Sequence, residues 1–225
     1  MRITLLKYLT PFLQPIYRQY FSRARRFRYG SIRIVVYPGV FYPGFIFSTK
    51  ILLNYIGKID LKGKRILDMG AGSGIIALMA AVKGAKATAT DINPEAIVNV
   101  RENAKLNNLN INVIESNLFT NVPIEDYDYI FINPPYYQKD PNGFPEMAWY
   151  CGSNHEYFKD LFIQLKEFSK ESCKVVMILS ESCNLRVIKD LAEEQEFIFS
   201  LVEQQKRFGE VYYIYHIYSQ EIGSR

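Results

Sequence analysis

The chain has 225 residues, of which 48% are apolar and 22% charged, a composition typical of globular proteins and unlike that of disordered or disulfide-rich chains. Its three cysteines lack the spacing of metal ligands, so neither a metal site nor a disulfide framework is expected. No apolar run reaches the roughly 18 residues of a membrane-spanning helix, and the N-terminus lacks a secretory cleavage site, which favours a cytoplasmic protein.

Positive charge is concentrated at the N-terminal end of the chain. Residues 1–59 contain ten Lys and Arg and no Asp or Glu, whereas residues 60–225 contain 17 Lys and Arg and 23 Asp and Glu. These halves carry +10 and −6, which sum to the net charge of +4. The split indicates an anionic partner for the N-terminal end, either RNA or a membrane surface. A packed or solvated helix is the alternative.

The first 60 residues predict local elements of their own. Residues 3–29 place Leu and aromatic side chains at near-helical intervals, which predicts one or two short helices broken at prolines. Residues 31–43 alternate β-branched and aromatic residues around Pro38-Gly39, which predicts a β-hairpin with its turn at this pair. A helix is expected from about Thr49 to Ile56. We therefore assign residues 1–45 to a basic extension with a hairpin.

From residue 64 onward, short apolar runs alternate with amphipathic stretches. Such alternation predicts an α/β fold with a doubly wound, mostly parallel sheet, because a helix most simply connects two parallel strands. The last two strands are joined by a short turn and should form an antiparallel pair at one edge. Strands are predicted over 64–70, 86–91, 111–116, 127–135, 174–181, 197–205 and 211–219, and helices over 75–84, 94–107, 156–169 and 185–195.

The first strand of this series ends in the sequence DMGAGSG, Asp68 to Gly74, directly before a helix. Glycines let the backbone turn sharply and approach a ligand closely, and a helix N-terminus favours electron-rich groups. Ile75 stands where the dinucleotide fingerprint has its third glycine, so the loop is not of that type. It predicts a site for a nucleotide-like ligand.

Polar residues also end the next two strands. Asp91, followed by Ile92, ends the second strand and is placed to accept hydrogen bonds from ribose hydroxyls. Asn117 and Leu118 follow the third strand, where they would contact the edge and face of an adenine. A nucleoside would thus lie across the strand ends.

The fourth strand ends in NPPYY, Asn133 to Tyr137. The Asn133 amide oxygen and the Pro134 carbonyl can accept the two protons of a substrate NH₂ group. Tyr136 would stack on the planar group that carries this nitrogen, whose lone pair would then face an electrophile.

The motifs DMGAGSG, TDINPEA and NPPYY, in this order, resemble the class I S-adenosylmethionine-dependent methyltransferases over about residues 35–218. Residues 40–53 and 148–162 are similar to segments of the HemK/PrmC-like group. The resemblance implies a Rossmann-like methyltransferase domain over 46–225 and the catalytic residues Asn133, Pro134 and Tyr136. It also implies S-adenosyl-L-methionine as the cofactor, bound by Asp68, Gly70, Ala71, Gly72, Gly74, Asp91, Ile92, Asn117, Leu118 and Asn133.

Three functions remain open at this point. The first is methylation of a glutamine side chain in a protein such as a translation release factor, which the HemK/PrmC resemblance favours. The second is N6-methylation of adenine in RNA or DNA, because NPPY serves either planar NH₂ group. The third is a non-catalytic cofactor-binding module that acts as an RNA-binding or assembly factor, and the intact NPPY motif argues against it.

Overall fold

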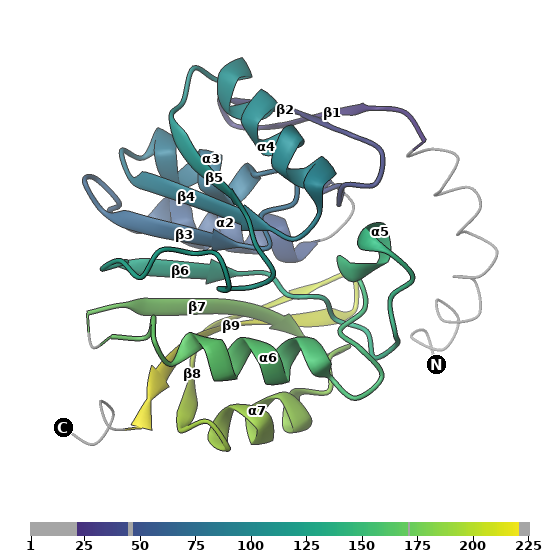
Figure 1. Ribbon diagram of the computed structural model, residues 1–225, viewed down its shortest axis with the longest axis vertical. Helices are drawn as coiled ribbons and strands as arrows, with labels where there is room; N and C mark the ends of the chain where they lie inside the picture. The colour runs from purple at the N-terminus through teal and green to yellow at the C-terminus, as the bar shows by residue number, and fades with distance from the viewer. Residues whose placement is uncertain (1–21, 45–46, 171, 221–225) are drawn as a thin grey trace.

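The computed structural model describes residues 22–44, 47–170 and 172–220. In this part of the chain one large sheet has seven strands in the order β5-β4-β3-β6-β7-β9-β8 (Figure 1). Its strands are β3 (Arg65–Met69), β4 (Lys86–Asp91), β5 (Ile111–Glu115), β6 (Tyr129–Ile132), β7 (Lys174–Ser180), β8 (Phe197–Arg207) and β9 (Glu210–Ser219).

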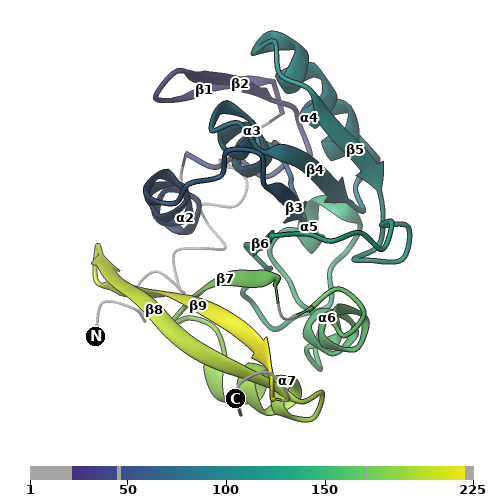
Figure 2. The same ribbon diagram turned by 90° about the vertical axis from the view of Figure 1, so that its left-hand side faces the viewer.

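Helices cover both faces of this sheet, which confirms the doubly wound fold (Figures 1 and 2). Pairing is parallel from β5 to β7, whereas β9 lies antiparallel between β7 and β8, as expected for the last two strands. Helix α5 was not expected from the sequence. The helices are α2 (Phe47–Lys58), α3 (Ile75–Val82), α4 (Pro94–Leu106), α5 (Phe144–Met147), α6 (Glu156–Leu165) and α7 (Leu185–Glu193).

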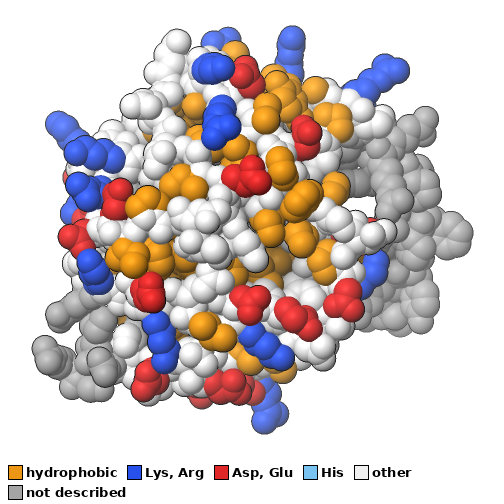
Figure 3. Space-filling view, viewed as in Figure 1, with side chains coloured by type: hydrophobic (Ala, Val, Ile, Leu, Met, Phe, Trp, Pro, Cys, Tyr) orange, Lys and Arg blue, Asp and Glu red, His pale blue; other side chains and the backbone are white. Residues whose placement is uncertain are grey.

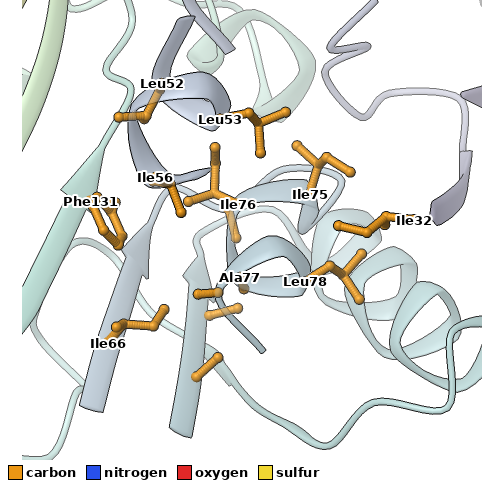
Figure 4. Close-up of a cluster of buried hydrophobic side chains, with 14 of the residues drawn as sticks. Ile32, Leu52, Leu53, Ile56, Ile66, Ile75, Ile76, Ala77, Leu78 and Phe131 are labelled. Atoms are coloured by element: carbon orange, nitrogen blue, oxygen red, sulfur yellow. The ribbon is translucent and has the colours of Figure 1, made fainter. Parts of the chain in front are cut away.

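Two hydrophobic cores lie on opposite sides of the sheet. One packs α2, α3 and α4 against it, and Figure 4 shows Ile56 of α2 and Ile76 of α3 meeting Ile66 and Phe131 of the sheet. The other packs α6 and α7 onto the opposite side chains of β3, β6 and β7. Strands buried on both faces read as continuous apolar runs, which explains why KRILDM and YIFI were recognisable as strands.

A separate hairpin precedes the sheet, but its turn is not where the sequence analysis placed it. Strand β1 (Arg25–Tyr29) pairs with β2 (Ile32–Val36), and Gly30-Ser31 forms the turn in place of Pro38-Gly39. Gly30 has a φ of 57°, a conformation that costs glycine little, and hairpin turns favour glycine there. Pro38 and Gly39 instead lie in the loop after β2.

The helical prediction for residues 3–29 is wrong for residues 25–29, which form β1. Residues 3–21 lie outside the described part of the chain. In β1, Arg26 and Arg28 are exposed, whereas Phe27 and Tyr29 pack against the core. This alternation has the two-residue period of a strand, and the preceding leucines obscured it.

The hairpin is fixed to the fold by asparagines that recur every four residues along α4 and at its C-terminal end. Asn103 Oδ1 accepts the Val35 N–H at 2.8 Å, and Asn99 Nδ2 donates to the Val35 carbonyl at 2.7 Å. Asn107 pairs with both backbone groups of Arg33 in the same way, at 3.0 and 2.6 Å. Because these side chains pair with the open edge of β2 as a neighbouring strand would, the hairpin is docked in one register.

Among residues 22–44, 47–170 and 172–220, no helix is both long enough and apolar enough to cross a membrane. In the same part of the chain, no group of three or more His, Cys, Asp and Glu side chains is arranged to hold a metal ion.

Candidate active site

The glycine-rich loop connects β3 to α3 at the C-terminal edge of the sheet. Gly70, Gly72 and Gly74 have φ values of 70°, 53° and 79°, a region that L-residues with side chains avoid. A Cβ at Gly74 would also lie 2.9 Å from Cγ1 of Val100 on α4. The loop is therefore held tightly against α4 and leads directly into the N-terminus of α3, where electron-rich groups are stabilised.

Asp68 lies beneath this loop and is 4% exposed. Its Oδ2 accepts the N–H of Ala77 in the first turn of α3 at 2.9 Å. Burial raises the pKa of Asp68 to about 7, with the Ala77 hydrogen bond lowering it and the nearby Asp91 adding to the rise. Because the pKa of this carboxyl lies near 7, a cationic ligand nearby would shift it from the protonated to the charged form at neutral pH.

Asp91 ends β4 and supports the glycine loop. Its Oδ2 accepts the Gly72 N–H at 2.8 Å, and its Oδ1 accepts the Asn93 N–H at 2.9 Å. Burial raises the pKa of Asp91, and the three backbone N–H bonds of its surroundings lower it. Each carboxylate oxygen keeps a further lone pair, so the predicted acceptance of ribose hydroxyls is compatible with these contacts.

Asn117 and Leu118 follow β5 in a tight turn. Asn117 is exposed, whereas Leu118 is 8% exposed and has a φ of 49°. Ser116 fixes this conformation because its hydroxyl donates to the Leu118 carbonyl at 2.8 Å. Asn117 is thus open to solvent, whereas most of the Leu118 side chain packs in the core, and their contacts with an adenine stay a prediction.

Asn133 follows β6 and is held by two neighbours. Its Nδ2 donates to the Thr49 hydroxyl of α2 at 3.2 Å, and its Oδ1 accepts from the Tyr136 hydroxyl at 3.3 Å. Thr49 is 3% exposed, so the first contact is shielded from water. In this arrangement the amide oxygen faces Tyr136 and the amide nitrogen faces Thr49, and the oxygen is the predicted acceptor for a substrate NH₂ group.

Tyr136 is anchored by its hydroxyl as well as by its ring. The Ile178 carbonyl of β7 is also 3.3 Å from this hydroxyl, so its single proton is shared between two acceptors, Asn133 Oδ1 and Ile178. Burial raises the pKa of Tyr136 well above its usual value. The Ser48 hydroxyl lowers the pKa of the Tyr136 phenol, but it makes no hydrogen bond of standard geometry with any described residue. Tyr136 is therefore rigid, which suits a residue predicted to position a planar group.

Aromatic residues that the sequence analysis did not assign to the site lie around it. Phe41 packs near the glycine loop, since a Cβ at Gly72 would lie 3.7 Å from the Phe41 Cβ. The Phe41 ring is 5.2 Å from that of Trp149, measured between centroids. Burial raises the pKa of Tyr157 on α6, and the charge of Asp91 adds to this rise. These residues could be assigned to the site only from the folded structure, because no motif in the sequence marks them.

The structure thus brings the predicted residues to one edge of the sheet, after β3, β4, β5 and β6. A comparison with protein-family models matches residues 31–146, just over half of the chain, to the methyltransferase small domain. The chain belongs to the methyltransferase small domain family. This match confirms that it is a methyltransferase, as the motifs at the strand ends predicted.

Curated relatives of this methyltransferase confirm the resemblance to the HemK/PrmC-like group. The chain is 36% identical over 158 residues to a putative protein N5-glutamine methyltransferase of Methanocaldococcus jannaschii, covering 68% of this chain and 77% of the relative. It is 32% identical over 172 residues to the release factor glutamine methyltransferase of Fusobacterium nucleatum, covering 69% of this chain and 49% of that enzyme.

Solved structures agree on the fold. The methyltransferase superposes on a chain of the E. cuniculi Mtq2–Trm112 complex with a TM-score of 0.63, at 19% identity, covering 80% of this chain and 99% of that one. A ribosomal protein L11 methylase of Lactobacillus delbrueckii matches with a TM-score of 0.57, at 24% identity, covering 75% and 77%. The Rossmann-like methyltransferase fold expected from the sequence is therefore confirmed.

Proposed function

We propose that this methyltransferase transfers the methyl group of S-adenosyl-L-methionine to the side-chain amide nitrogen of a glutamine in a protein, with a translation release factor as the leading substrate. The observation that carries the proposal is the Asn133 amide, held by Thr49 and Tyr136 at the strand end beside the glycine loop. The glutamine methyltransferases among the relatives support the choice of acceptor.

The residues present fit this cofactor. Asp91 offers carboxylate oxygens for ribose hydroxyls, Leu118 an apolar surface and Asn117 a polar group for adenine, and the loop from Gly70 through Ala71 to Gly74 lets the backbone come close. When bound, S-adenosyl-L-methionine supplies a methyl group made electrophilic by a positively charged sulfur. Ile92, beside Asp91, is partly exposed and completes the proposed contacts.

The protein's own contribution is alignment. Asn133 Oδ1 and the Pro134 carbonyl accept the two amide protons of the substrate, and the rigid Tyr136 limits the tilt of the planar group. Positioning a nucleophile against an electrophile in this way supplies several kcal/mol of rate acceleration by itself.

Incubation with radiolabelled S-adenosyl-L-methionine and purified release factor tests the proposal. We expect protease-sensitive, RNase-resistant label, and mass spectrometry should locate one added methyl group on a glutamine. Label on adenine in RNA or DNA would instead establish the alternative acceptor, since NPPY can hold either NH₂ group.

The cofactor affinity should depend on pH through Asp68. Because burial raises the pKa of Asp68 to about 7, this carboxyl is mostly protonated at pH values well below 7 in the free protein, and a cationic ligand favours its charged form, so we expect binding to release a proton there. We expect the affinity to rise with pH up to about 7, by at most about tenfold per pH unit, and then to level off. Calorimetry in buffers of different ionisation enthalpy measures the proton release.

The raised pKa of Asp68 gives the stability of the free protein the opposite dependence on pH. Because the pKa of Asp68 is higher in the folded than in the unfolded chain, the folded state binds more protons between about pH 4 and 7. The contribution of this group to the free energy of unfolding therefore falls as the pH rises through that range. Asp68→Asn should flatten both profiles, and an unchanged affinity profile in this variant would refute the assignment.

We further propose that the basic hairpin docks an anionic partner. Lys and Arg side chains stand along the upper rim of Figure 3, where β1, β2 and α4 lie in Figure 1. Arg26, Arg28 and Arg33 are exposed, and Arg28 lies directly opposite Arg33 across the hairpin. Like charges in such a cross-strand pair destabilise the hairpin, which favours a role in binding.

Replacing Arg23, Arg26, Arg28 and Arg33 by Ser should raise the KM for a macromolecular substrate and flatten its dependence on salt, because counter-charges are lost from the encounter. The affinity for S-adenosyl-L-methionine should not change. Steady-state kinetics at several salt concentrations provide the measurement. A loss of thermal stability with an unaltered salt dependence would show that these arginines serve the fold alone.

A further inference from the structure

The turn between β8 and β9 contains a residue that its backbone disfavours. Arg207 pairs with Glu210, so Phe208 and Gly209 form a two-residue turn, with φ values of 49° and 91°. Two positive φ angles define the turn type that prefers Asn-Gly, because a bulky side chain is strained at the first position. Phe208 therefore occupies a place where asparagine would be more stable.

Phe208 gains little burial in return. Its side chain is 91% exposed, and among the described residues its ring is stacked on that of Phe47, with centroids 5.0 Å apart. An exposed aromatic ring in a strained conformation stabilises the fold little. A strained backbone at an exposed aromatic residue is typical of a residue kept for binding, because it adds little to the stability of the fold.

The hairpin tip lies on the same side of the molecule as the acceptor site. Ile178, whose carbonyl accepts from Tyr136, pairs with Ile214, and β9 begins four residues earlier at Glu210. Strands advance about 3.3 Å per residue, so the tip extends on the order of 20 Å beyond the level of Asn133. In Figure 2 the paired strands β8 and β9 reach toward α2.

The first turn of α2 connects this tip to Asn133. Phe47 stacks on Phe208, and Thr49, two residues later, accepts the Asn133 Nδ2. The backbone of α2 thus links the aromatic pair to Thr49 within the first turn of the helix, although the Phe47 and Thr49 side chains leave α2 on different faces. A polypeptide that places a glutamine against Asn133 and runs along this rim toward α2 would bring its neighbouring residues to the aromatic pair.

We propose that Phe208 and Phe47 form a docking platform for the polypeptide segment beside the acceptor glutamine, and that this segment places an apolar or aromatic side chain on Phe208. The inference rests on the proposed function because it requires a polypeptide acceptor. It adds the β8–β9 turn as the element that selects the substrate, separate from the residues that bind the cofactor.

The test is Phe208→Asn, because it supplies the residue that the turn prefers while removing the platform. We expect the Tm to rise by about 1–3 °C and the KM for release factor to rise about five- to thirtyfold, with kcat and the cofactor Kd unchanged. Phe208→Trp should keep a low KM. Leu201→Asn is the matched control, because Leu201 is also on β8 and 51% exposed but lies about 20 Å from the tip.

A lower Tm in Phe208→Asn would show that Phe208 supports the fold, and an unchanged KM would show that it does not bind substrate; either result overturns the platform. If the wild-type enzyme does not methylate release factor, the proposed substrate is wrong, and labelling of lysate proteins decides the inference. Weaker protein labelling by Phe208→Asn than by Leu201→Asn supports the platform, and equal labelling, or label found in RNA alone, overturns it.

Discussion

Asn133→Ala is expected to lower the rate of methyl transfer at least about a hundredfold while leaving the affinity for S-adenosyl-L-methionine within about twofold. The amide oxygen of Asn133 is the predicted acceptor for the substrate NH₂ group, so its loss removes the alignment of the nitrogen with the methyl group. Single-turnover kinetics with the purified protein substrate and calorimetry with the cofactor separate the two effects.

Thr49 makes this prediction sharper. Because Thr49 accepts from Nδ2 and Tyr136 donates to Oδ1, the amide of Asn133 has a defined orientation. Thr49→Val keeps the shape but removes the acceptor, so we expect kcat to fall about tenfold with an unaltered cofactor Kd, and Thr49→Ser should restore it. If Asn133→Ala retained near wild-type turnover, NPPY would not hold the acceptor nitrogen.

The fold and the order of the site residues were predictable because their signals are local. Strands buried on both faces are short apolar runs, the glycine loop follows one of them directly, and the chemistry of this fold gathers at the ends of parallel strands. Thus Asp91 and Asn133, 42 positions apart in the sequence, could be assigned to one edge before the structure was known.

The contacts that position these residues were not predictable, because they depend on how distant segments pack. Residues 40–53, which contain Thr49, resemble a segment of the HemK/PrmC-like group, but that resemblance did not indicate that Thr49 meets Asn133 across 84 positions. The same holds for Phe41 beside Gly72 and for Tyr157, whose pKa is raised by burial and by the charge of Asp91. In the hairpin, both Gly30-Ser31 and Pro38-Gly39 could have formed the turn; the turn lies at Gly30-Ser31, and the hydrogen bonds of β2 with α4, which hold this register, link segments distant in the sequence.

Asp91→Ala is expected to weaken binding of S-adenosyl-L-methionine by about 1.5–3 kcal/mol, or about ten- to 150-fold in Kd. The structure gives two causes for this loss. The variant lacks the carboxylate oxygens predicted to accept the ribose hydroxyls, and the Gly72 and Asn93 N–H groups lose the acceptor that each has at 2.8 and 2.9 Å. The glycine loop would then be ordered only when the cofactor binds, and that ordering reduces the net affinity.

Asp91→Asn separates these two causes. Its amide oxygen can still accept one backbone N–H, so the loop keeps part of its support, while the charge that strengthens the ribose hydrogen bonds is lost. We therefore expect an intermediate Kd by calorimetry, and a Tm nearer to that of the wild type than Asp91→Ala has. An affinity for the cofactor that is unchanged in both variants would refute the ribose assignment. A loss in Asp91→Ala alone would mean that Asp91 acts through the Gly72 loop and not through contact with the ribose.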